Sequence, residues 1–389
     1  MSQVEITTLG KSCEFFNGKA HEKDIDVNGK YIVVNSKFIS QEGRVVKRTK
    51  EQMFPLYKGD IVMVMSDVPN GKALAKCFII DIDDTYSLNQ RICCIRSKEF
   101  DAKYLYYQLN RNEHFLAFNN GENQTNLRKD DILDCPLIKP SLEEQRRMVA
   151  ELDIAFSELE KAKTNTQVNL NNASELFKSE LNGTFIRKGE NWVEKKLKEI
   201  GLTQTGNTPK TSEPDNYGDY IPFVKPPHFL PNGTIDNEDS CLSEKGVKSA
   251  RIFRENSILM VCIGATIGKT GFSEIPVTSN QQINALTPKP EFEARFFYYA
   301  LTTDIFFSKI MHASSQATLP IINKSKWENL SVPFPISRIE QQEIVKRLDL
   351  LSIEAIKLQE KYSEKFEKLE ELKSGILKRA FEKELIEVE

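Results

Sequence analysis

The sequence predicts an α+β protein: two mixed α/β domains separated by two long helices that pair as an antiparallel coiled coil, with an internal pseudo-two-fold repeat. The motif EQRRMVAELD, residues 144–153, returns 196 residues later as EQQEIVKRLD, residues 340–349. After each copy, apolar residues recur at steps of three and four over about forty positions, which is the spacing of a coiled-coil seam. The segment before the second copy also repeats, in the same order, the sequence patterns of the segment before the first copy. A repeat of this length indicates two copies of one plan.

Both long helices are expected to begin after a proline-bearing stretch. The first follows CPLIKPS and the second follows SVPFPIS. Proline ends a strand, and Ser141 or Ser337 can cap the helix that comes next. A helix of about 42 residues spans roughly 60 Å. Two helices of matched length pair most simply with each other, in antiparallel orientation; the alternative is a helical hairpin that only spaces two domains.

The seam of this helix pair is expected to be mostly apolar, with a few polar positions. The repeat places Leu176 of the first helix opposite Leu372 of the second, both in the seam. Thr166 and Asn169 in the first helix, and Lys365 in the second, are the polar seam positions. A polar seam residue can fix the register of a coiled coil at some cost in stability.

The repeat divides the chain into four segments. They are 1–140 for the first domain, 141–190 for the central helix, 191–335 for the second domain and 336–389 for the C-terminal helix. Residues 183–192 are expected to form a short polar linker. Strand-like runs at 31–35, 60–65 and 91–95 mark the first domain and have counterparts in the second. The aromatic run 104–109 is expected to be a packed helix because of its place in the repeat.

Composition and charge exclude several classes of protein. The 389 residues carry a net charge of −3 and are 40% hydrophobic and 28% charged, as in ordinary soluble proteins. No apolar run approaches a membrane span and no N-terminal signal is visible, so a cytoplasmic location without a membrane partner is expected. The seven cysteines show no CxxC pair, which favours reduced thiols. DNA binding would need local basic patches or a more basic partner.

Residues 264–271, GATIGKTG, resemble a phosphate-binding loop but fail on spacing. A P-loop has four residues between its first Gly and the Gly-Lys pair. Here three residues separate Gly264 from Gly268, and the residue before Gly264 is Ile263. No acidic strand of the Walker-B type follows. Nucleotide hydrolysis is therefore not expected, and the glycines are interpreted as a tight strand-to-strand turn that a ligand can approach closely.

The segment 205–226, TGNTPKTSEPDNYGDYIPFVKP, is expected to form a long ordered loop. Its Thr208, Lys210 and Lys225 can reach phosphates, and its Asn207 can read a base edge. Amide clusters recur at 89–91, 123–124 and 280–282. Amides suit adenine edges and arginine suits guanine. The alternative is that these side chains only form turns and strand ends on a surface without a partner.

No catalytic signature is visible in the chain. The four histidines are scattered and have no carboxylate at a useful spacing. GxSxG, HExxH and paired-carboxylate patterns are missing, as is the [DN]PP[FY] tetrapeptide of adenine methyltransferases. The chain is therefore expected to have no catalytic activity of its own.

The domain–helix–domain–helix order, the paired EQ openings of the helices, TGNTP and GATIGKTG together resemble the specificity (S) subunit of type I restriction-modification systems. The resemblance covers essentially the whole chain. It implies two target-recognition domains, each reading one half of a split site in double-stranded DNA, and two helices that set the gap and dock two methyltransferase subunits. Motor-nuclease subunits join the assembly, and S-adenosylmethionine, ATP and Mg belong to the partners. The chain itself is expected to hold no cofactor and no metal.

The resemblance implies contact residues in both domains. TGNTP has only NGKAH as its counterpart in the first domain, which fits an asymmetric target. The DNA-binding residues expected in the second domain are Thr208, Lys210, Lys225, Thr266, Lys269, Asn280, Gln281 and Gln282. Those expected in the first domain are Lys19, Asn35, Lys72, Asn89, Gln90, Arg91, Gln124 and Arg128. The methyltransferase-docking candidates are Glu144, Arg147, Glu340 and Glu343. The alternatives are a subunit that partners a fused methyltransferase-nuclease, a coiled-coil NTPase, and a non-DNA coiled-coil scaffold.

Overall fold

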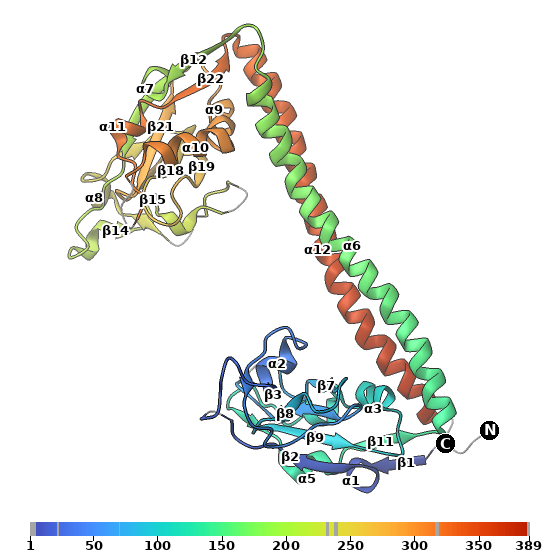
Figure 1. The fold of residues 1–389 in the computed structure, drawn as a ribbon. Helices are drawn as coiled ribbons and strands as arrows, with labels where there is room; N and C mark the ends of the chain where they lie inside the picture. Colours follow the sequence, from blue (N-terminus) through green and yellow to red (C-terminus); the bar gives the residue numbers. More distant parts are fainter. Residues whose placement is uncertain are drawn as a thin grey trace. The chain divides into compact units, whose positions relative to one another are not determined.

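The computed structural model describes residues 5–21, 23–69, 71–230, 233–236, 240–315 and 319–386. The chain divides into two units, Met1–Asn165 with Lys365–Glu389, and Thr166–Glu364. Two long helices, α6 (Leu142–Arg187) and α12 (Arg338–Ile386), each contribute residues to both units (Figure 1). Each unit also contains one globular domain, called the first and the second domain below.

The first domain is built on a four-stranded sheet and a three-stranded sheet (Figure 1). Its strands are β1 (Glu5–Thr8), β2 (Glu14–Asn17), β3 (Tyr31–Val34), β4 (Arg48–Thr49), β5 (Ile61–Val64), β6 (Ser66–Asp67), β7 (Cys77–Ile79), β8 (Tyr86–Leu88), β9 (Ile92–Arg96), β10 (Thr125–Asn126) and β11 (Pro136–Lys139). Its helices are α1 (Leu9–Ser12), α2 (Ser36–Ser40), α3 (Ala102–Leu109), α4 (Glu113–Leu116) and α5 (Lys129–Leu133). The sheet orders are β2-β9-β5-β7 and β4-β3-β8, and β3 runs parallel to β8.

The second domain repeats this plan with additions. Its strands are β12 (Trp192–Lys196), β13 (Gly201–Thr205), β14 (Tyr217–Gly218), β15 (Ile221–Val224), β16 (Cys241–Leu242), β17 (Ile252–Phe253), β18 (Ser257–Val261), β19 (Thr270–Ser273), β20 (Val277–Ser279), β21 (Ile283–Pro288) and β22 (Ser331–Pro335). Its helices are α7 (Leu197–Ile200), η1 (Pro214–Asn216), η2 (Pro226–His228), α8 (Glu244–Val247), α9 (Ala294–Leu301), α10 (Asp304–Ala313) and α11 (Lys324–Trp327). The sheet β13-β21-β18-β19 matches β2-β9-β5-β7, and the parallel pair β15–β20 matches β3–β8.

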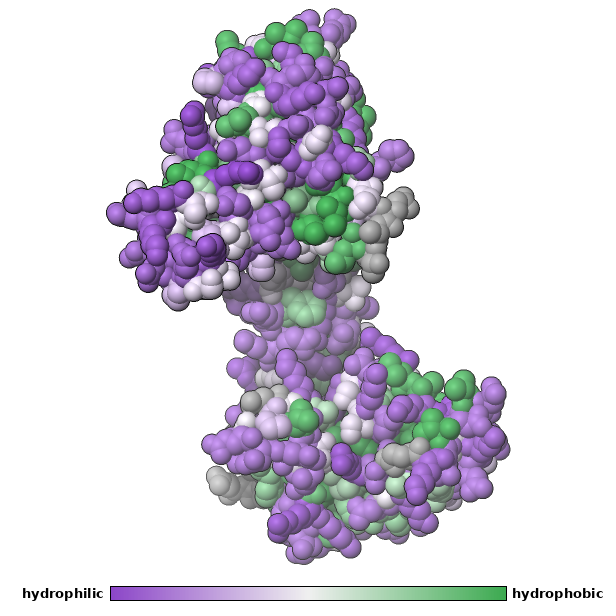
Figure 2. Space-filling view, turned by 90° about the vertical axis from the view of Figure 1, so that its left-hand side faces the viewer, coloured by the Kyte–Doolittle hydropathy of each residue, from purple (hydrophilic) through white to green (hydrophobic). Residues whose placement is uncertain are grey.

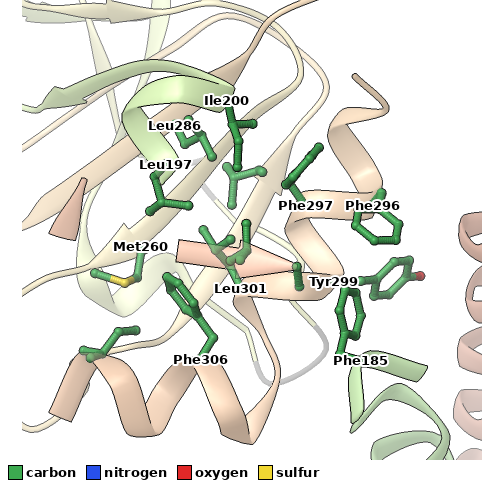
Figure 3. Packing of buried hydrophobic residues seen from close by; sticks show 14 of the residues in the cluster. Phe185, Leu197, Ile200, Met260, Leu286, Phe296, Phe297, Tyr299, Leu301 and Phe306 are labelled. Carbon is green, nitrogen blue, oxygen red and sulfur yellow. The ribbon is translucent and has the colours of Figure 1, made fainter. Parts of the chain in front are cut away.

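The central strands are apolar on both faces because each four-stranded sheet is covered on both sides. In β5, Ile61 and Met63 pack toward helix α3, while Val62 and Val64 pack toward the three-stranded sheet. In β18, alternate residues likewise enter two different clusters. Figure 3 shows the larger of these, in which Met260 and Leu286 of the sheet face Phe297 and Leu301 of α9. This burial on both faces explains why the strands read as continuous apolar runs, and the predicted α+β fold class is confirmed.

The two long helices pair in antiparallel orientation within each unit. In the first unit, Phe156 and Leu159 near the start of α6 pack with Leu369 and Ile376 near the end of α12. In the second unit, Arg347 near the start of α12 donates a hydrogen bond to Thr184 near the end of α6, at 3.1 Å. The antiparallel pairing predicted from the repeat is therefore confirmed.

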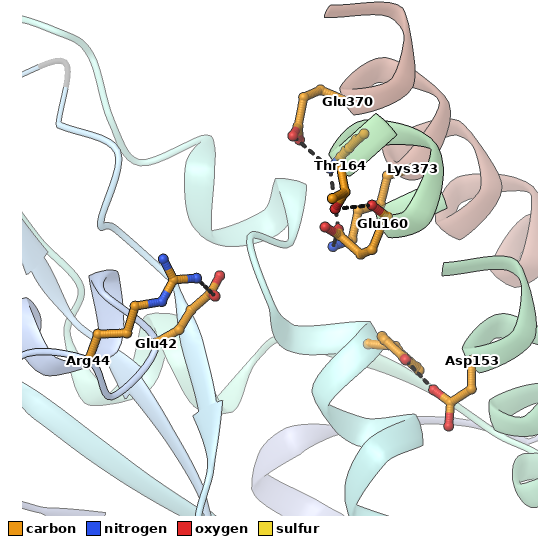
Figure 4. A network of polar contacts seen from close by, with 9 residues as sticks. Glu42, Arg44, Asp153, Glu160, Thr164, Glu370 and Lys373 are labelled. Carbon is orange, nitrogen blue, oxygen red and sulfur yellow. Dashed lines mark hydrogen bonds and ion pairs between the residues drawn. The ribbon is translucent and has the colours of Figure 1, made fainter. Parts of the chain in front are cut away.

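A buried lysine lies in the helix pair of the first unit. The Lys163 side chain is only 9% exposed, and its ammonium lies 2.6 Å from Glu370 and 3.4 Å from Glu160. Lys373 of α12 also reaches Glu160, at 3.3 Å, which closes the network between the helices (Figure 4). Burial lowers the pKa of Lys163, but the two carboxylates raise it more, so its net shift is upward. The buried polar group between the helices is thus an ion-paired lysine, Lys163, which is not among the polar seam residues predicted from the sequence.

The predicted seam was wrong in detail. Leu176 is 59% exposed and Leu372 is 50% exposed. Asn169 and Lys365 are exposed as well, and of the predicted polar seam residues only Thr166 is buried. The inward position next to Leu176 is taken by Phe177, whose ring contacts Tyr299 of the second domain. A repeat shows which positions correspond, but it does not show which of two neighbouring apolar residues points inward.

The predicted linker at 183–192 was also wrong. Helix α6 continues to Arg187, and β12 begins at Trp192. Phe185 is 2% exposed because its ring packs against Trp192 and Phe296. Ser141 caps α6 through a capping box with Glu144, as predicted.

The EQ…LD motif that marks each helix docks that helix onto its own domain. Gln145 accepts a hydrogen bond from the Asp101 N–H at 2.8 Å and donates to the Pro140 carbonyl at 2.9 Å. Gln341 accepts from the Glu293 N–H at 2.9 Å and donates to the Pro335 carbonyl at 2.8 Å. Both amides are fully buried. The motif therefore joins helix α6 to the start of α3, and helix α12 to the start of α9, in the same way.

The aspartates that end the two motif copies complete this docking. Asp153 accepts from the Tyr107 hydroxyl at 2.6 Å and pairs with Lys103. Asp349 accepts from the Tyr299 hydroxyl and pairs with Arg295 at 2.8 Å. Burial and the neighbouring carboxylate both raise the pKa of Tyr107 and of Tyr299. Each tyrosine therefore stays a neutral donor to its aspartate.

Candidate nucleic-acid interface

In the first domain, two loops meet where the parallel strands β3 and β8 end. We call residues 18–21 the glycine loop and residues 89–91 the amide turn. The Asn89 N–H donates to the Val34 carbonyl at 3.1 Å, and the Gln90 N–H donates to the Lys19 carbonyl at 3.0 Å. Gly18 lies so close that a Cβ there would sit 2.0 Å from the Asn89 carbonyl oxygen. Only glycine allows this approach.

The second domain builds the same junction from residues 206–209 and 280–282, its own glycine loop and amide turn. The Asn280 N–H donates to the Val224 carbonyl at 3.2 Å. A Cβ on Gly206 would sit 2.3 Å from the Asn280 carbonyl oxygen. The Thr208 hydroxyl donates to the Gln281 side-chain oxygen at 2.7 Å, which ties the two loops together. Gly206 and Gly18 therefore make the same close backbone contact with the amide turn of their own domain.

A third loop follows the central strand of each sheet and lies against the amide turn. In the second domain this hairpin loop, residues 262–269, joins β18 to β19, and its glycines Gly264 and Gly268 have φ values of 90° and 85°. The Val261 N–H donates to the Lys269 carbonyl at 2.9 Å. Thr266 and Lys269 thus lie on a tight turn between strands, as predicted.

The counterpart in the first domain follows β5 and has a different shape. The Met65 N–H donates to the Arg91 carbonyl at 3.0 Å, as the Cys262 N–H donates to the Gln282 carbonyl at 2.8 Å. Gln124 reaches this loop by donating to the Ser66 hydroxyl at 2.9 Å. Arg128 immediately precedes α5. Lys72 is exposed and lies just before Ala73 and Leu74, whose backbone N–H groups donate to the Asp67 carboxylate. The loops carrying the candidate residues therefore meet at one end of the sheets in each domain.

The charged candidates around these loops are exposed, except for Lys225, which is half-buried. Lys19, Arg91 and Lys269 are exposed, and Lys210 is 78% exposed beside Glu213 at 3.5 Å. The Lys225 ammonium lies 5.4 Å from the Phe223 ring centroid. Asn35 instead caps helix α2 by accepting from the Phe38 N–H at 2.9 Å, so its side-chain oxygen is already bonded. Exposed cations and amide side chains thus lie on the loops of these junctions.

Two further residues organise these loops: His21, for which no role was predicted from the sequence, and Asn207, for which a different role was predicted. His21 is 1% exposed, with one ring nitrogen 2.7 Å from the Lys19 carbonyl and the other 2.8 Å from the Ser87 hydroxyl. These two contacts of the His21 ring hold the glycine loop in place. Asn207, proposed to read a base edge, instead donates to the Ser249 carbonyl at 2.6 Å and accepts from the Arg251 N–H at 2.9 Å. Both bonds cross about forty residues, so no local pattern signals them.

The docking candidates on the helices differ in availability. Glu144 is occupied by the capping box with Ser141, and Glu340 accepts from the Trp192 indole N–H at 3.0 Å. Arg147 and Glu343 are exposed. The free surface of each motif copy is therefore carried by the residues that follow the buried glutamine.

On the face drawn in Figure 2, hydrophilic residues cover most of the surface, and hydrophobic residues form small separate patches. None of the helices in the described part of the chain combines the length and apolar character needed to span a bilayer. Within the described ranges, no group of His, Cys, Asp or Glu side chains could hold a metal ion. All seven cysteines are free thiols.

A family model for the type I restriction modification DNA specificity domain matches residues 1–170 and 189–368. Among curated proteins, the chain is 30% identical over 184 residues to the type I restriction enzyme MjaIX specificity subunit of Methanocaldococcus jannaschii, covering 46% of this chain and 42% of that protein. It is 29% identical over 151 residues to the HindI specificity subunit of Haemophilus influenzae, covering 38% and 33%. The chain thus spans less than half the length of these two relatives.

Solved structures share the fold. One, described as the structural basis of complex assembly and conformational transition of the type I R-M system, has a TM-score of 0.79 at 19% identity, covering 97% of both chains. The HsdS subunit from Thermoanaerobacter tengcongensis has a TM-score of 0.58 at 19% identity, covering 97% of this chain and 96% of that one. At this identity the likeness concerns the fold alone.

Proposed function

We infer that this chain, which belongs to the type I restriction-modification DNA specificity family, is the sequence-reading subunit of such a system. Each domain reads one half of a bipartite, asymmetric site in double-stranded DNA, and the helices set the spacing between the halves. The observation that carries this proposal is the repeated junction of three loops. Both domains group exposed cations and amides at the same end of the same strands, while some side chains at corresponding positions differ, as Arg91 and Gln282 do.

The residues divide into two roles. Lys19, Lys210, Lys225 and Lys269 bind phosphates, which gives affinity without sequence information. The amide turns and Arg91 contact base edges in the major groove, where each base pair shows a distinct pattern of donors and acceptors. The near-neutral charge of the chain fits a subunit that shares its phosphate contacts with its partners.

The partners supply the chemistry in this proposal. Two methyltransferase subunits dock on the helices, near exposed Arg147 and Glu343, and motor-nuclease subunits join them. S-adenosylmethionine, ATP and Mg belong to those partners, and the chain itself is non-catalytic. Two similar copies of the docking motif favour two methyltransferases for each chain.

Mapping modified bases by long-read sequencing tests the proposal. A host that expresses the chain with its cognate methyltransferase should carry methylation at one bipartite motif with a fixed gap. Lys269→Ala should weaken DNA binding of the complex for all sequences and lower the salt slope by about one unit. Native mass measurement should give two methyltransferases per chain. A continuous motif, or methylation without sequence dependence, would contradict this proposal. DNA cleavage by a single fused methyltransferase-nuclease partner would favour the alternative system instead.

A further inference from the structure

The hydrogen bonds of the amide turn in the second domain fix which way its amides point. The Gln282 backbone N–H donates to the Asn280 side-chain oxygen at 3.1 Å. Because a backbone N–H can only donate, the other end of the Asn280 amide must be its NH2 group. That NH2 group donates to the Gln282 side-chain oxygen at 3.0 Å. The Gln282 NH2 group is left as the free end of this chain of bonds.

The free NH2 group of Gln282 is rigidly held and available. The Gln282 carbonyl accepts from the Cys262 N–H at 2.8 Å, so both backbone groups of this residue are engaged. The side chain is half-buried, and its nitrogen is not among the buried polar atoms without a partner in the described residues. The turn therefore presents the free NH2 donor of the Gln282 side chain to solvent, while one of the two lone pairs of its oxygen is engaged by Asn280.

The first domain places Arg91 at the corresponding position. Its carbonyl accepts from the Met65 N–H at 3.0 Å, as that of Gln282 does from Cys262. Arg91 is exposed and has a φ of 66°, which is uncommon for a residue with a side chain. Its guanidinium carries only donors. Although the residue types differ, both domains present hydrogen-bond donors at the same point of the same turn.

We propose that Gln282 and Arg91 each read a hydrogen-bond acceptor on a base edge, so that Gln282 selects a keto base, guanine or thymine, and Arg91 selects guanine. In the major groove, guanine O6 and thymine O4 are acceptors, whereas the corresponding groups of cytosine and adenine are NH2 donors. The two-bond pairing of an amide with adenine needs both its oxygen and its nitrogen. The Gln282 oxygen is held by the Asn280 NH2 group at 3.0 Å, so the NH2 group is the end of this side chain that is wholly free to contact a base. This proposal rests on the proposed function and names the bases.

Base mapping with variants of Gln282 tests the assignment. Gln282→Glu keeps an oxygen for the Asn280 NH2 group but replaces the free donor with an acceptor. It should shift one position of one half-site from guanine or thymine to adenine or cytosine. Gln282→Ala should make that position degenerate, with discrimination falling by about 10-fold to 100-fold. Gln167→Glu, in α6 and outside the turn, carries the same charge change and should leave the motif unaltered.

Variants of Arg91 supply the reciprocal control. Arg91→Ala should relax one guanine in the other half-site only, and the intact half serves as evidence that the chain still folds and assembles. If a variant methylates nothing, binding of its purified complex to duplexes with each of the four bases at that position decides the question. A cytosine or adenine at the wild-type position, or an unchanged motif in Gln282→Ala and Gln282→Glu, would overturn the assignment. A wild-type complex without a bipartite motif would instead overturn the proposed function.

Discussion

Replacing Gln341 with Met should remove the bonds that dock helix α12 onto the second domain while keeping the volume of the side chain. Gln341 is fully buried, and it satisfies the Glu293 N–H and the Pro335 carbonyl. Leaving a buried donor or acceptor unsatisfied costs about 1–3 kcal/mol each. The two together should lower the stability of this unit by about 3 kcal/mol. For a unit of this size, that corresponds to a fall in Tm of about 6–12 °C.

Hydrogen exchange locates the effect at one amide. The Glu293 N–H should exchange faster in Gln341→Met, since Gln341 is its acceptor. The Asp101 N–H, which donates to Gln145 in the first domain, should keep its protection from hydrogen exchange. Gln145→Met should produce the reverse pattern. Equal changes at both amides, or a loss of stability without faster exchange at Glu293, would refute the idea that the EQ motif acts by this docking.

Three further outcomes are expected. Four residues inserted after Thr166 lengthen α6 by about 6 Å, so the methylated half-sequences should stay the same while the gap between them grows by one or two base pairs. Base mapping measures this gap, and an unchanged gap would contradict the prediction. Lys163→Met should keep or raise thermal stability, because it leaves two solvated carboxylates, whereas Glu370→Ala should lower it by removing the carboxylate 2.6 Å from a buried ammonium; a reversed order in thermal unfolding would contradict this. Burial raises the pKa of Cys13 to about 11, so its alkylation, followed by mass spectrometry, should be slow at pH 8 and become faster as the pH rises toward that pKa; rapid modification at pH 8 would contradict this.

The features predictable from the sequence are those that constrain residue type directly. Gly18 and Gly206 correspond because a Cβ at either would collide with the amide turn, so the backbone approach leaves a glycine at both positions. The strands β5 and β18 were predictable because burial on both faces demands unbroken apolar runs. The helix pair was predictable from its apolar period.

The features that were not predictable depend on partners distant in sequence. Asn207 is as suitable for a base edge as for an internal bond, and only the approach of Ser249 and Arg251 decides between them. Gln341 resembled a solvent-exposed member of a charged run, yet its partners lie in the segment before the helix and at the start of α9. Leu176 and Phe177 are both apolar, and packing against Tyr299 selects the second.

The two junctions also show how one scaffold can carry different specificities. The bonds that place the amide turns are made by backbone atoms. Asn89 and Asn280 donate to Val34 and Val224, and Met65 and Cys262 donate to Arg91 and Gln282. Because these bonds do not depend on side chains, the residue at the reading position can change from Arg91 to Gln282 without moving the turn. Each glycine loop is also held by a backbone bond, from Gly18 to the Ile92 carbonyl and from Gly206 to the Ile283 carbonyl. The side chains proposed to face the DNA are therefore free to differ, whereas a Cβ at Gly18 or Gly206 would collide with the amide turn.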